Sequence, residues 1–365
     1  MSQITSNAAR ISVLLIASIS ILALVPNAQN PAESLLTTEN AYNPIPSPDG
    51  KYIAYVRTGW GEKVFSSFGR SSLVSDVKII DLADAASSPR TIAKGYFTAG
   101  WTPDSVDIVC YRDWNYSLVS IDGKQIHKGR IPNNPARADL ASEWAGYSAF
   151  LGTFVWSRVI DSSHGALEMP GRTVAKGKPI WNGRVIPSPN GRYLAVFGGN
   201  TTTELRIYDL QLQLWTDLGG ITIHPDTNWS YIQPDWNPWF ADSSRLVFLK
   251  NTALEIATPD GTHRTEITIE GSAGLPTPSP DGQSIAYVTF DPRPQQGRPD
   301  LQFWGGTTIL VVAALPGSPP RTVSLKNSDE VYDLKWLNNN ALVFDRVADE
   351  PFYKHARIWR AAVIR

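Results

Sequence analysis

Residues 45–57 carry the sequence IPSPDGKYIAYVR, and two further stretches of the chain repeat it closely. Residues 186–198 are IPSPNGRYLAVFG, and residues 277–289 are TPSPDGQSIAYVT. A repeated phrase of this kind indicates that one structural unit is used several times along the chain. The chemistry of that unit therefore decides the fold.

The letters SPDG predict a turn, and the residues after them predict a strand. Pro48 presets the backbone angle φ for the turn, and the Asp49 side chain bonds back to nearby backbone. Gly50 takes the left-handed conformation that closes a hairpin. Residues 51–57 then alternate in polarity and include β-branched and aromatic side chains, as strands do. Each copy of the phrase therefore predicts a β-hairpin.

Weaker copies of the same turn and strand lie between and beyond the strong ones. We mark each copy by the residue that aligns with Ser47, which gives the markers Ser47, Thr102, Ser148, Ser188, Phe240, Ser279 and Leu337. The mean interval between them is about 48 residues, a period typical of four-stranded propeller blades. Seven markers favour seven blades. The Ser148 copy lacks the Pro-Asp pair, and if it is not a blade, six remain as the alternative.

The last unit needs a strand from elsewhere in the chain. Its third predicted strand is ARIWRAAVI (356–364), and no fourth follows it. The segment ESLLTTENA (33–41) is well placed to supply that strand and to remove the exposed edges of the sheet. We therefore predict an all-β fold: a single β-propeller of four-stranded antiparallel blades over residues 31–365, closed by an N-terminal strand. Trp101, Trp239 and Trp336 directly precede a marker, and this recurrence predicts core positions between blades.

The first thirty residues differ from the rest. Residues 11–25, ISVLLIASISILALV, carry no charge and follow Arg10, as in a secretory signal peptide. Ala28 is a possible cleavage residue, and an uncleaved N-terminal anchor is the alternative. No cysteine follows the segment, which excludes a lipoprotein anchor. We expect an exported protein, periplasmic or extracellular, that touches a membrane only through residues 1–30 if they are retained.

Composition excludes several classes of partner and cofactor. The formal net charge is −1 and 18% of residues are charged, so nothing indicates binding to nucleic acid. The single cysteine, Cys110, excludes an intramolecular disulfide framework and a cysteine-based zinc site. Hydrophobic residues at 42% indicate a folded globule. We expect a monomer without cofactor.

The repeats SPDGKYIAYV, SPNGRYLAVF and SPDGQSIAYV closely resemble the TolB-type (WD40-like) propeller repeat of bacterial envelope proteins. The resemblance covers essentially the whole chain after residue 30. It implies the propeller fold and leaves the function open, because one fold serves many functions. The family includes a periplasmic protein of the Tol–Pal envelope system, propeller parts of serine peptidases, and pectin-degrading lyases.

No catalytic or metal-binding motif is present in the sequence. A peptidase would need a G-x-S-x-G nucleophile elbow, and the chain contains none. The histidines show no short-range zinc spacing, and they stand far apart at His127, His164, His224, His263 and His355. We therefore predict no catalytic residues and no metal ligands.

Cationic residues recur where the second strand of each unit ends. Five of the seven positions there are basic, and they are Arg57, Arg112, Arg158, Lys250 and Arg346. We call these five residues the basic ring, since equivalent positions of a propeller surround its axis on one face. Guanidinium groups suit carboxylate or phosphate oxygens. The alternative is that nearby acids neutralise the ring, with Asp113, Asp161, Asp345 and Asp349 as the nearest in sequence.

Aromatic residues and one long insertion are expected on that same face. Connections between second and third strands, and between blades, carry Trp60, Trp114, Trp144, Trp229 and Trp304. The insertion DPRPQQGRPDLQFWGG (291–306) adds Arg293, and we expect it to form an ordered surface loop rather than a strand. We call this the loop-rich face. Exposed indoles often anchor the side chains of a partner.

These features favour a binding or scaffold protein. The leading prediction is an exported, non-catalytic propeller that recognises a protein segment or an acidic ligand, such as an envelope glycan, through its loop-rich face. The alternative is a lyase acting on uronate-containing polysaccharide, which would need histidines or a His–carboxylate cluster converging at the axis. A third possibility, a structural component without a ligand, would leave the basic ring fully paired with acids.

Overall fold

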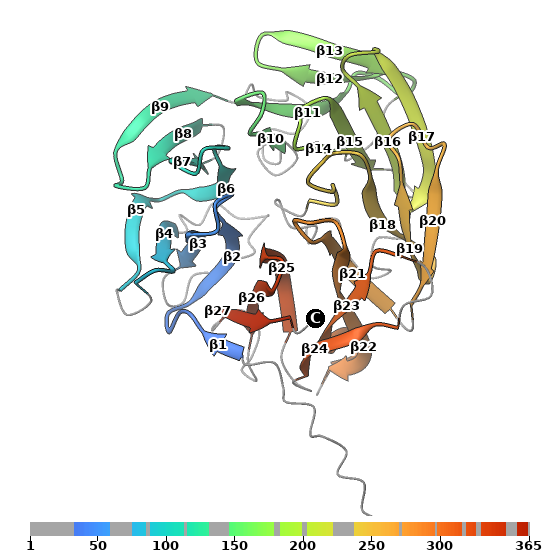
Figure 1. The fold of residues 1–365 in the computed structure, drawn as a ribbon. Coiled ribbons are helices and arrows are strands. Elements are labelled where there is room, and N and C mark those ends of the chain that lie inside the picture. The colour runs from blue at the N-terminus through green and yellow to red at the C-terminus, as the bar shows by residue number, and fades with distance from the viewer. Residues whose placement is uncertain are drawn as a thin grey trace, which may run out of the picture. The chain divides into compact units, whose positions relative to one another are not determined.

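The computed structural model confirms the propeller. It describes residues 33–58, 75–84, 88–112, 115–130, 146–178, 183–198, 203–221, 237–269, 272–295, 298–315, 319–325, 330–347 and 356–363. Within these residues there is no helix, and the strands form seven antiparallel sheets. Figure 1 shows the sheets following one another around a centre, in chain order from blue to red. The Ser148 unit forms a blade, so seven is the correct number.

Each sheet is one blade, numbered from the N-terminus. Blade 1 contains β2 (Ala41–Pro46), β3 (Tyr52–Thr58), β4 (Ser75–Asp81) and β5 (Arg90–Lys94). Blade 2 contains β6 (Phe97–Trp101), β7 (Asp107–Arg112), β8 (Asn115–Ser120) and β9 (Gln125–Arg130). Blade 3 contains β10 (Gly146–Ser148), β11 (Thr153–Val159), β12 (Gly165–Met169) and β13 (Arg172–Gly177).

The remaining blades follow the same order. Blade 4 contains β14 (Arg184–Pro187), β15 (Tyr193–Gly198), β16 (Thr203–Asp209) and β17 (Leu214–Ile221). Blade 5 contains β18 (Leu246–Lys250), β19 (Ala253–Ala257) and β20 (Arg264–Thr268), and its inner strand is reduced to a bridge between Trp239 and Leu246. Blade 6 contains β21 (Ser272–Pro278), β22 (Ser284–Gln295), β23 (Arg298–Ala313) and β24 (Arg321–Leu325).

Blade 7 closes the ring as predicted. It contains β25 (Glu330–Asn338), β26 (Ala341–Val347), β27 (Ala356–Ala362) and, from the start of the propeller, β1 (Glu33–Leu35). β1 pairs antiparallel with β27, with Ser34 opposite Arg360. The two ends of the propeller are thus held in one sheet, which protects the outer edge of β27.

The core lies between facing blades. One cluster joins Ile45, Ala54 and Val77 of blade 1 to Trp101 and Ile108 of blade 2, and all five are buried. The other clusters described also combine residues of neighbouring blades. This arrangement follows from the strand pattern, because alternate side chains of each strand face opposite neighbours.

The three predicted core tryptophans fasten neighbouring blades together. Trp101, Trp239 and Trp336 are 4%, 4% and 7% exposed. Each indole nitrogen donates to a backbone carbonyl on the inner strand of the preceding blade: Ile45 O at 2.9 Å, Ile186 O at 3.0 Å and Thr277 O at 2.9 Å. All three acceptors lie two residues before a marker. The core prediction is confirmed, and the bonds show why an indole is used at these positions.

The turn that begins at each marker also links blades. At the same three joints, the amide of the third turn residue donates to a side chain in the turn of the next blade. Asp49 N donates to Ser105 Oγ, Asn190 N to Ser243 Oγ, and Asp281 N to Asn339 Oδ1, each at 3.0 Å. Ser105 and Ser243 adopt left-handed backbone conformations, with φ of 63° and 61°. The hydroxyl that each presents to its neighbour offers a reason for placing serine rather than glycine there.

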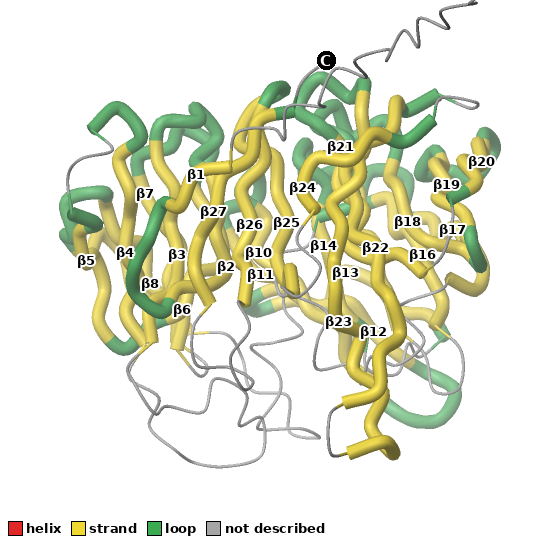
Figure 2. Tube along the Cα trace, turned by 90° about the horizontal axis from the view of Figure 1, so that it is seen from below, coloured by secondary structure: helices red, strands yellow, loops and turns green. Residues whose placement is uncertain are grey.

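The expectation of a loop over residues 291–306 was wrong for most of that segment. β22 and β23 run on as a two-stranded arm, in which Pro292 lies opposite Trp304 and Arg293 opposite Phe303. Figure 2 shows this arm projecting beyond the other strands at the lower edge of the view. We expected a loop because proline is rare inside strands. Pro292 and Pro294 are two residues apart, so their missing N–H groups face one edge, and β21 pairs with β22 only as far as Phe290.

Candidate functional site

All five residues of the basic ring lie at or next to the end of the second strand of a blade. Arg112 and Lys250 are the last residues of β7 and β18, and Arg57, Arg158 and Arg346 are the last but one of β3, β11 and β26. In blade 6 the equivalent position is Thr289, and the arm begins immediately beyond it. The arm therefore continues the strand whose counterparts carry the basic ring.

In blades 3 and 5, the ring cation is paired with a glutamate on the third strand. Arg158 contacts Glu168 of β12, with Nη2 and Oε1 2.6 Å apart, and its Nε donates to the same oxygen at 2.7 Å. Lys250 Nζ lies 3.3 Å from Glu255 Oε2 of β19, and Arg264 also donates to Glu255 at 2.9 Å. Glu255 is 5% exposed, so its charge is compensated where water is scarce.

The basic residue of blade 1 is held more loosely. Arg57 lies 3.7 Å from Glu39 and 3.6 Å from Asp76, and its side chain is 38% exposed. Glu39 is shared, because it also accepts two bonds of 2.8 Å from Lys78 and one from the Tyr55 hydroxyl. Burial, followed by that hydrogen bond, raises the pKa of the Tyr55 phenol far above its usual value. The neutral phenol therefore acts as a donor here.

Arg112 and Arg346 stand at the two extremes of exposure. Arg112 is exposed, and its guanidinium lies over Gly95, where an added Cβ would stand 2.9 Å from Nη1. Arg346 is 2% exposed and donates to both oxygens of Glu33 at 2.8 and 3.0 Å. Its guanidinium also lies 5.0 Å from the ring centre of Phe344 and 5.1 Å from that of Trp359. Arg346 is therefore part of the closure of the ring.

The described ion pairs of the ring use Glu33, Glu39, Asp76, Glu168 and Glu255. Asp161 bonds His164 at 2.9 Å, and Asp345 accepts from the backbone amides of Asp333 at 2.7 Å and Asn43 at 3.4 Å. Asp113 and Asp349 lie outside the described residues. The partners in these described ion pairs come from neighbouring strands, from the segment before β2 or, for Glu33, from the far end of the chain. Glu168 faces Trp156, diagonally across from Arg158.

The predicted aromatic lining falls largely outside the described residues. Trp60, Trp114, Trp144 and Trp229 all lie there. Trp304 is on β23 and Arg293 on β22, so the structure brings these two predicted site positions together on adjacent strands of the arm. Their grouping follows directly from the hairpin register.

The described histidines do not converge. His127 is on the outer strand of blade 2, His164 beside the β11–β12 connection of blade 3, and His263 in the turn before β20 of blade 5. His224 and His355 lie outside the described part of the chain. Among the residues that are described, no group of three histidine, cysteine or acidic side chains could hold a metal ion.

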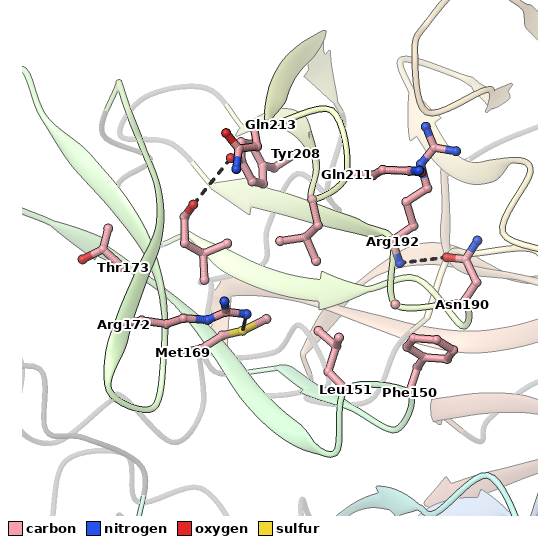
Figure 3. Close-up of a pocket in the computed structure, with 13 residues that line it drawn as sticks. Phe150, Leu151, Met169, Arg172, Thr173, Asn190, Arg192, Tyr208, Gln211 and Gln213 are labelled. Atoms are coloured by element: carbon pink, nitrogen blue, oxygen red, sulfur yellow. Dashed lines mark hydrogen bonds between the residues drawn. The ribbon is translucent and has the colours of Figure 1, made fainter.

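A pocket that the sequence did not predict lies between blades 3 and 4. It has a volume of about 500 Å³, and the turns of both blades contribute to its lining. Figure 3 shows Leu151 and Met169 on one side and Gln211 and Gln213 on the other, with Arg172 beside Met169. The signal for it was the degenerate turn SAFLG, in which Phe150 replaces the usual Asp or Asn.

No protein-family model and no curated protein match this sequence. Solved structures do: an oligogalacturonate lyase in complex with manganese aligns with a TM-score of 0.60 at 12% identity, over 93% of this chain and 95% of that one. The β-propeller domain of the Trilobed protease from Pyrococcus furiosus gives 0.54 at 10% identity, over 88% and 96%. A putative TolB from Agrobacterium tumefaciens gives 0.42 at 13% identity, over 76% and 95%.

The seven sheets define the class of protein, a β-propeller, and the likenesses with TM-scores of 0.60 and 0.54 agree with that fold and show nothing finer. The resemblance of the repeats to TolB-type propellers is confirmed at the level of the fold. The Trilobed protease domain is described as having an open velcro topology, whereas this chain closes its ring with β1. In the described part of the chain, no helix has the length and apolar character needed to cross a membrane.

Proposed function

We propose that this protein is an exported, non-catalytic binding propeller that recognises a segment of another protein through its loop-rich face. The observation that carries the proposal is the arm. β22 and β23 are 12 and 16 residues long, against at most 9 for the other strands that are described. Two-stranded ribbons are marginally stable by themselves, and a partner strand along a free edge is a common way to complete them.

The two edges of the arm differ. On β22, the prolines at 292 and 294 remove two donors, which blunts that edge as natural edge strands often are. On β23, β24 pairs only with residues Thr308–Val311, so residues 298–307 extend past it. The edge of β23 is therefore the one suited to pairing with an added strand.

The ion pairs favour a protein segment over an acidic polymer. Arg158 and Lys250 are paired with glutamates, and Arg346 is buried with Glu33. An anionic ligand would have to displace these acids and would gain little, since each cation already has a charge partner. Arg57 and Lys250, with side chains 38% and 41% exposed, are the more accessible of the ring cations in ion pairs. The ring then serves mainly to hold the ends of these second strands in place.

The lyase alternative rests on the structural likeness to the oligogalacturonate lyase, which at 12% identity concerns the fold alone. The described histidines stand on three different blades. Nothing among the described residues offers the axial cluster that this chemistry needs.

The test is affinity capture from envelope extract with three baits. The first is the propeller, and the second has residues 291–306 replaced by Asn-Gly, a pair that forms a two-residue hairpin between Phe290 and Thr307. The third carries Arg57→Gln and Arg112→Gln. We expect a protein that the first and third baits retain and the second loses. Loss by the third bait alone would instead indicate an acidic ligand, and equal capture by all three would contradict the proposal.

A further inference from the structure

The joint between blades 3 and 4 lacks the turn bond that links blades 1 and 2, 4 and 5, and 6 and 7. At the joints of blades 1 and 2 and of blades 4 and 5, a turn amide donates to Ser105 or Ser243. The equivalent residue of blade 4 is Gly191, which has no side chain to accept. Opposite it, blade 3 presents Phe150. The Phe150 ring rests on Gly191, where an added Cβ would stand 2.4 Å from it.

An opening lined by both blades lies beside Phe150 and Gly191. Leu151, Met169, Val174 and Leu210 supply apolar surface, while the amides of Gln211 and Gln213 supply polar groups. At about 500 Å³ the opening has the size of a ligand pocket. Phe150 is 65% exposed, and Leu212, in the turn between the two glutamines, is 59% exposed. Large apolar side chains at the rim of a pocket are typical of surfaces that contact another protein.

One cation in the pocket has no acidic partner among the described residues. Arg172, the first residue of β13, makes a single weak bond of 3.5 Å to the Met169 sulfur. Arg264, the first residue of β20, contrasts with it because it donates to Glu255 at 2.9 Å. The other pocket arginine, Arg192, is held by three bonds to Asp209, the shortest 2.7 Å. The charge of Arg172 alone is thus available to a ligand.

We propose that this pocket binds a protein segment in which an acidic side chain stands beside a large aliphatic one. The carboxylate pairs with the Arg172 guanidinium, and the aliphatic side chain enters the apolar surface between Leu151 and Leu210. Phe150 and Leu212 cover the segment from the rim. The site lies at the turns that begin at the markers, and it does not depend on the arm or on the basic ring.

The test uses a defined probe, acetyl-Leu-Asp-Leu-amide, with acetyl-Leu-Asn-Leu-amide as its neutral match. Binding is followed by NMR chemical-shift changes in the amides of residues 150–151 and 172–174. We expect saturable shifts with the acidic peptide and about tenfold weaker binding of the neutral one, as a charge-assisted hydrogen bond predicts. Arg172→Ala should bind both peptides equally weakly.

The matched control is Arg90→Ala, because Arg90 begins β5 in the same Arg-Thr sequence and the pocket is remote from it. This variant should bind like the unmodified protein. Phe150→Ala should weaken both peptides while preserving the preference for the acid. Absence of saturable shifts at millimolar peptide, or equal binding of the two peptides, overturns the proposal. Hexanoate is a separate probe: binding of hexanoate without binding of the peptide would indicate a small organic acid and would also overturn it.

Discussion

Arg346 and Glu33 close the propeller across 313 positions of sequence. The guanidinium on β26 donates to both carboxylate oxygens at the start of β1, and the Arg346 side chain is 2% exposed. β1 has only three residues in its pairing with β27, so backbone bonds alone give this strand little hold. The ion pair, flanked by the rings of Phe344 and Trp359, adds a second attachment.

Removing the acid should destabilise the closure. We expect Glu33→Ala to lower the free energy of unfolding by about 3 kcal/mol, because it leaves Arg346 charged and buried. Urea unfolding followed by tryptophan fluorescence measures the loss. Lys250→Ala is the control, since the Lys250 side chain is 41% exposed and its loss should cost less than about 1 kcal/mol. Equal losses in the two variants would show that the Glu33 pair has no special role in closure.

The hydrogen bonds of the core tryptophans predict that removing one indole N–H donor lowers the stability of the protein. Trp101→Phe keeps an aromatic ring, loses the pyrrole part of the indole and leaves the Ile45 carbonyl without its buried donor. We expect a loss of about 2 kcal/mol in unfolding free energy. Trp215→Phe is the matched control, because its indole bonds the Lys176 carbonyl at an exposed position and 3.2 Å. A loss no larger than that of the control would contradict a stabilising role for the buried bond.

Two substitutions at Ser105 separate the cost of its left-handed backbone from the contribution of its hydrogen bond to Asp49. Ser105→Gly removes both the unfavourable φ of 63° and the hydroxyl that accepts from Asp49, so the two effects should nearly cancel. Ser105→Ala loses the bond but keeps the strain, which only glycine relieves, so we expect about 1 kcal/mol less stability than in the glycine variant. Thermal unfolding of both variants checks the order. A Ser105→Ala midpoint equal to that of the unmodified protein would contradict a stabilising bond between blades 1 and 2, and equal midpoints of the two variants would contradict the strain.

The Asp49 turn should make the stability of the fold depend on pH in the acidic range. A hydrogen bond from Ser47 is the main reason that the pKa of Asp49 falls from 3.8 to about 2. A carboxyl with a lower pKa in the folded protein stabilises the fold above its unfolded pKa, and this contribution is lost as pH falls from 3.8 towards 2. Carboxyl NMR titration should show the Asp49 pKa rising towards its usual value in Ser47→Ala. An unchanged midpoint would refute the role of the hydroxyl.

The blades could be predicted because their signal is local. Pro48, Asp49 and Gly50 specify a turn whatever lies around them, and the hydrophobic alternation after them specifies a strand. The closure of the ring by a strand within residues 33–41 was also predictable, since the last blade otherwise has one open edge; the strand formed is β1. The turn at Phe150 could not be predicted in this way. It lacks the usual Pro-Asp pair although the blade is formed, and the pocket lies beside it.

The site was less predictable because its contacts are not local. Glu33 reaches Arg346 only once the ring is closed, and Glu39 reaches Arg57 and Lys78 from the segment between β1 and β2. The arm escaped prediction because proline normally argues against a strand. That rule assumes a neighbour on both edges, and the arm has none on the outer edge of β22 in the described structure.

Site-specific photo-crosslinking at the arm tests the central claim most directly. A benzoylphenylalanine placed at Trp304 on β23 probes the arm in the intact cell, and one at Gln125, an exposed position on the outer strand β9, is its control. The account predicts a discrete protein adduct from position 304 and none from position 125. No adduct at 304, or the same adducts from both positions, would contradict recognition through the arm and would favour a structural propeller without a partner on this face.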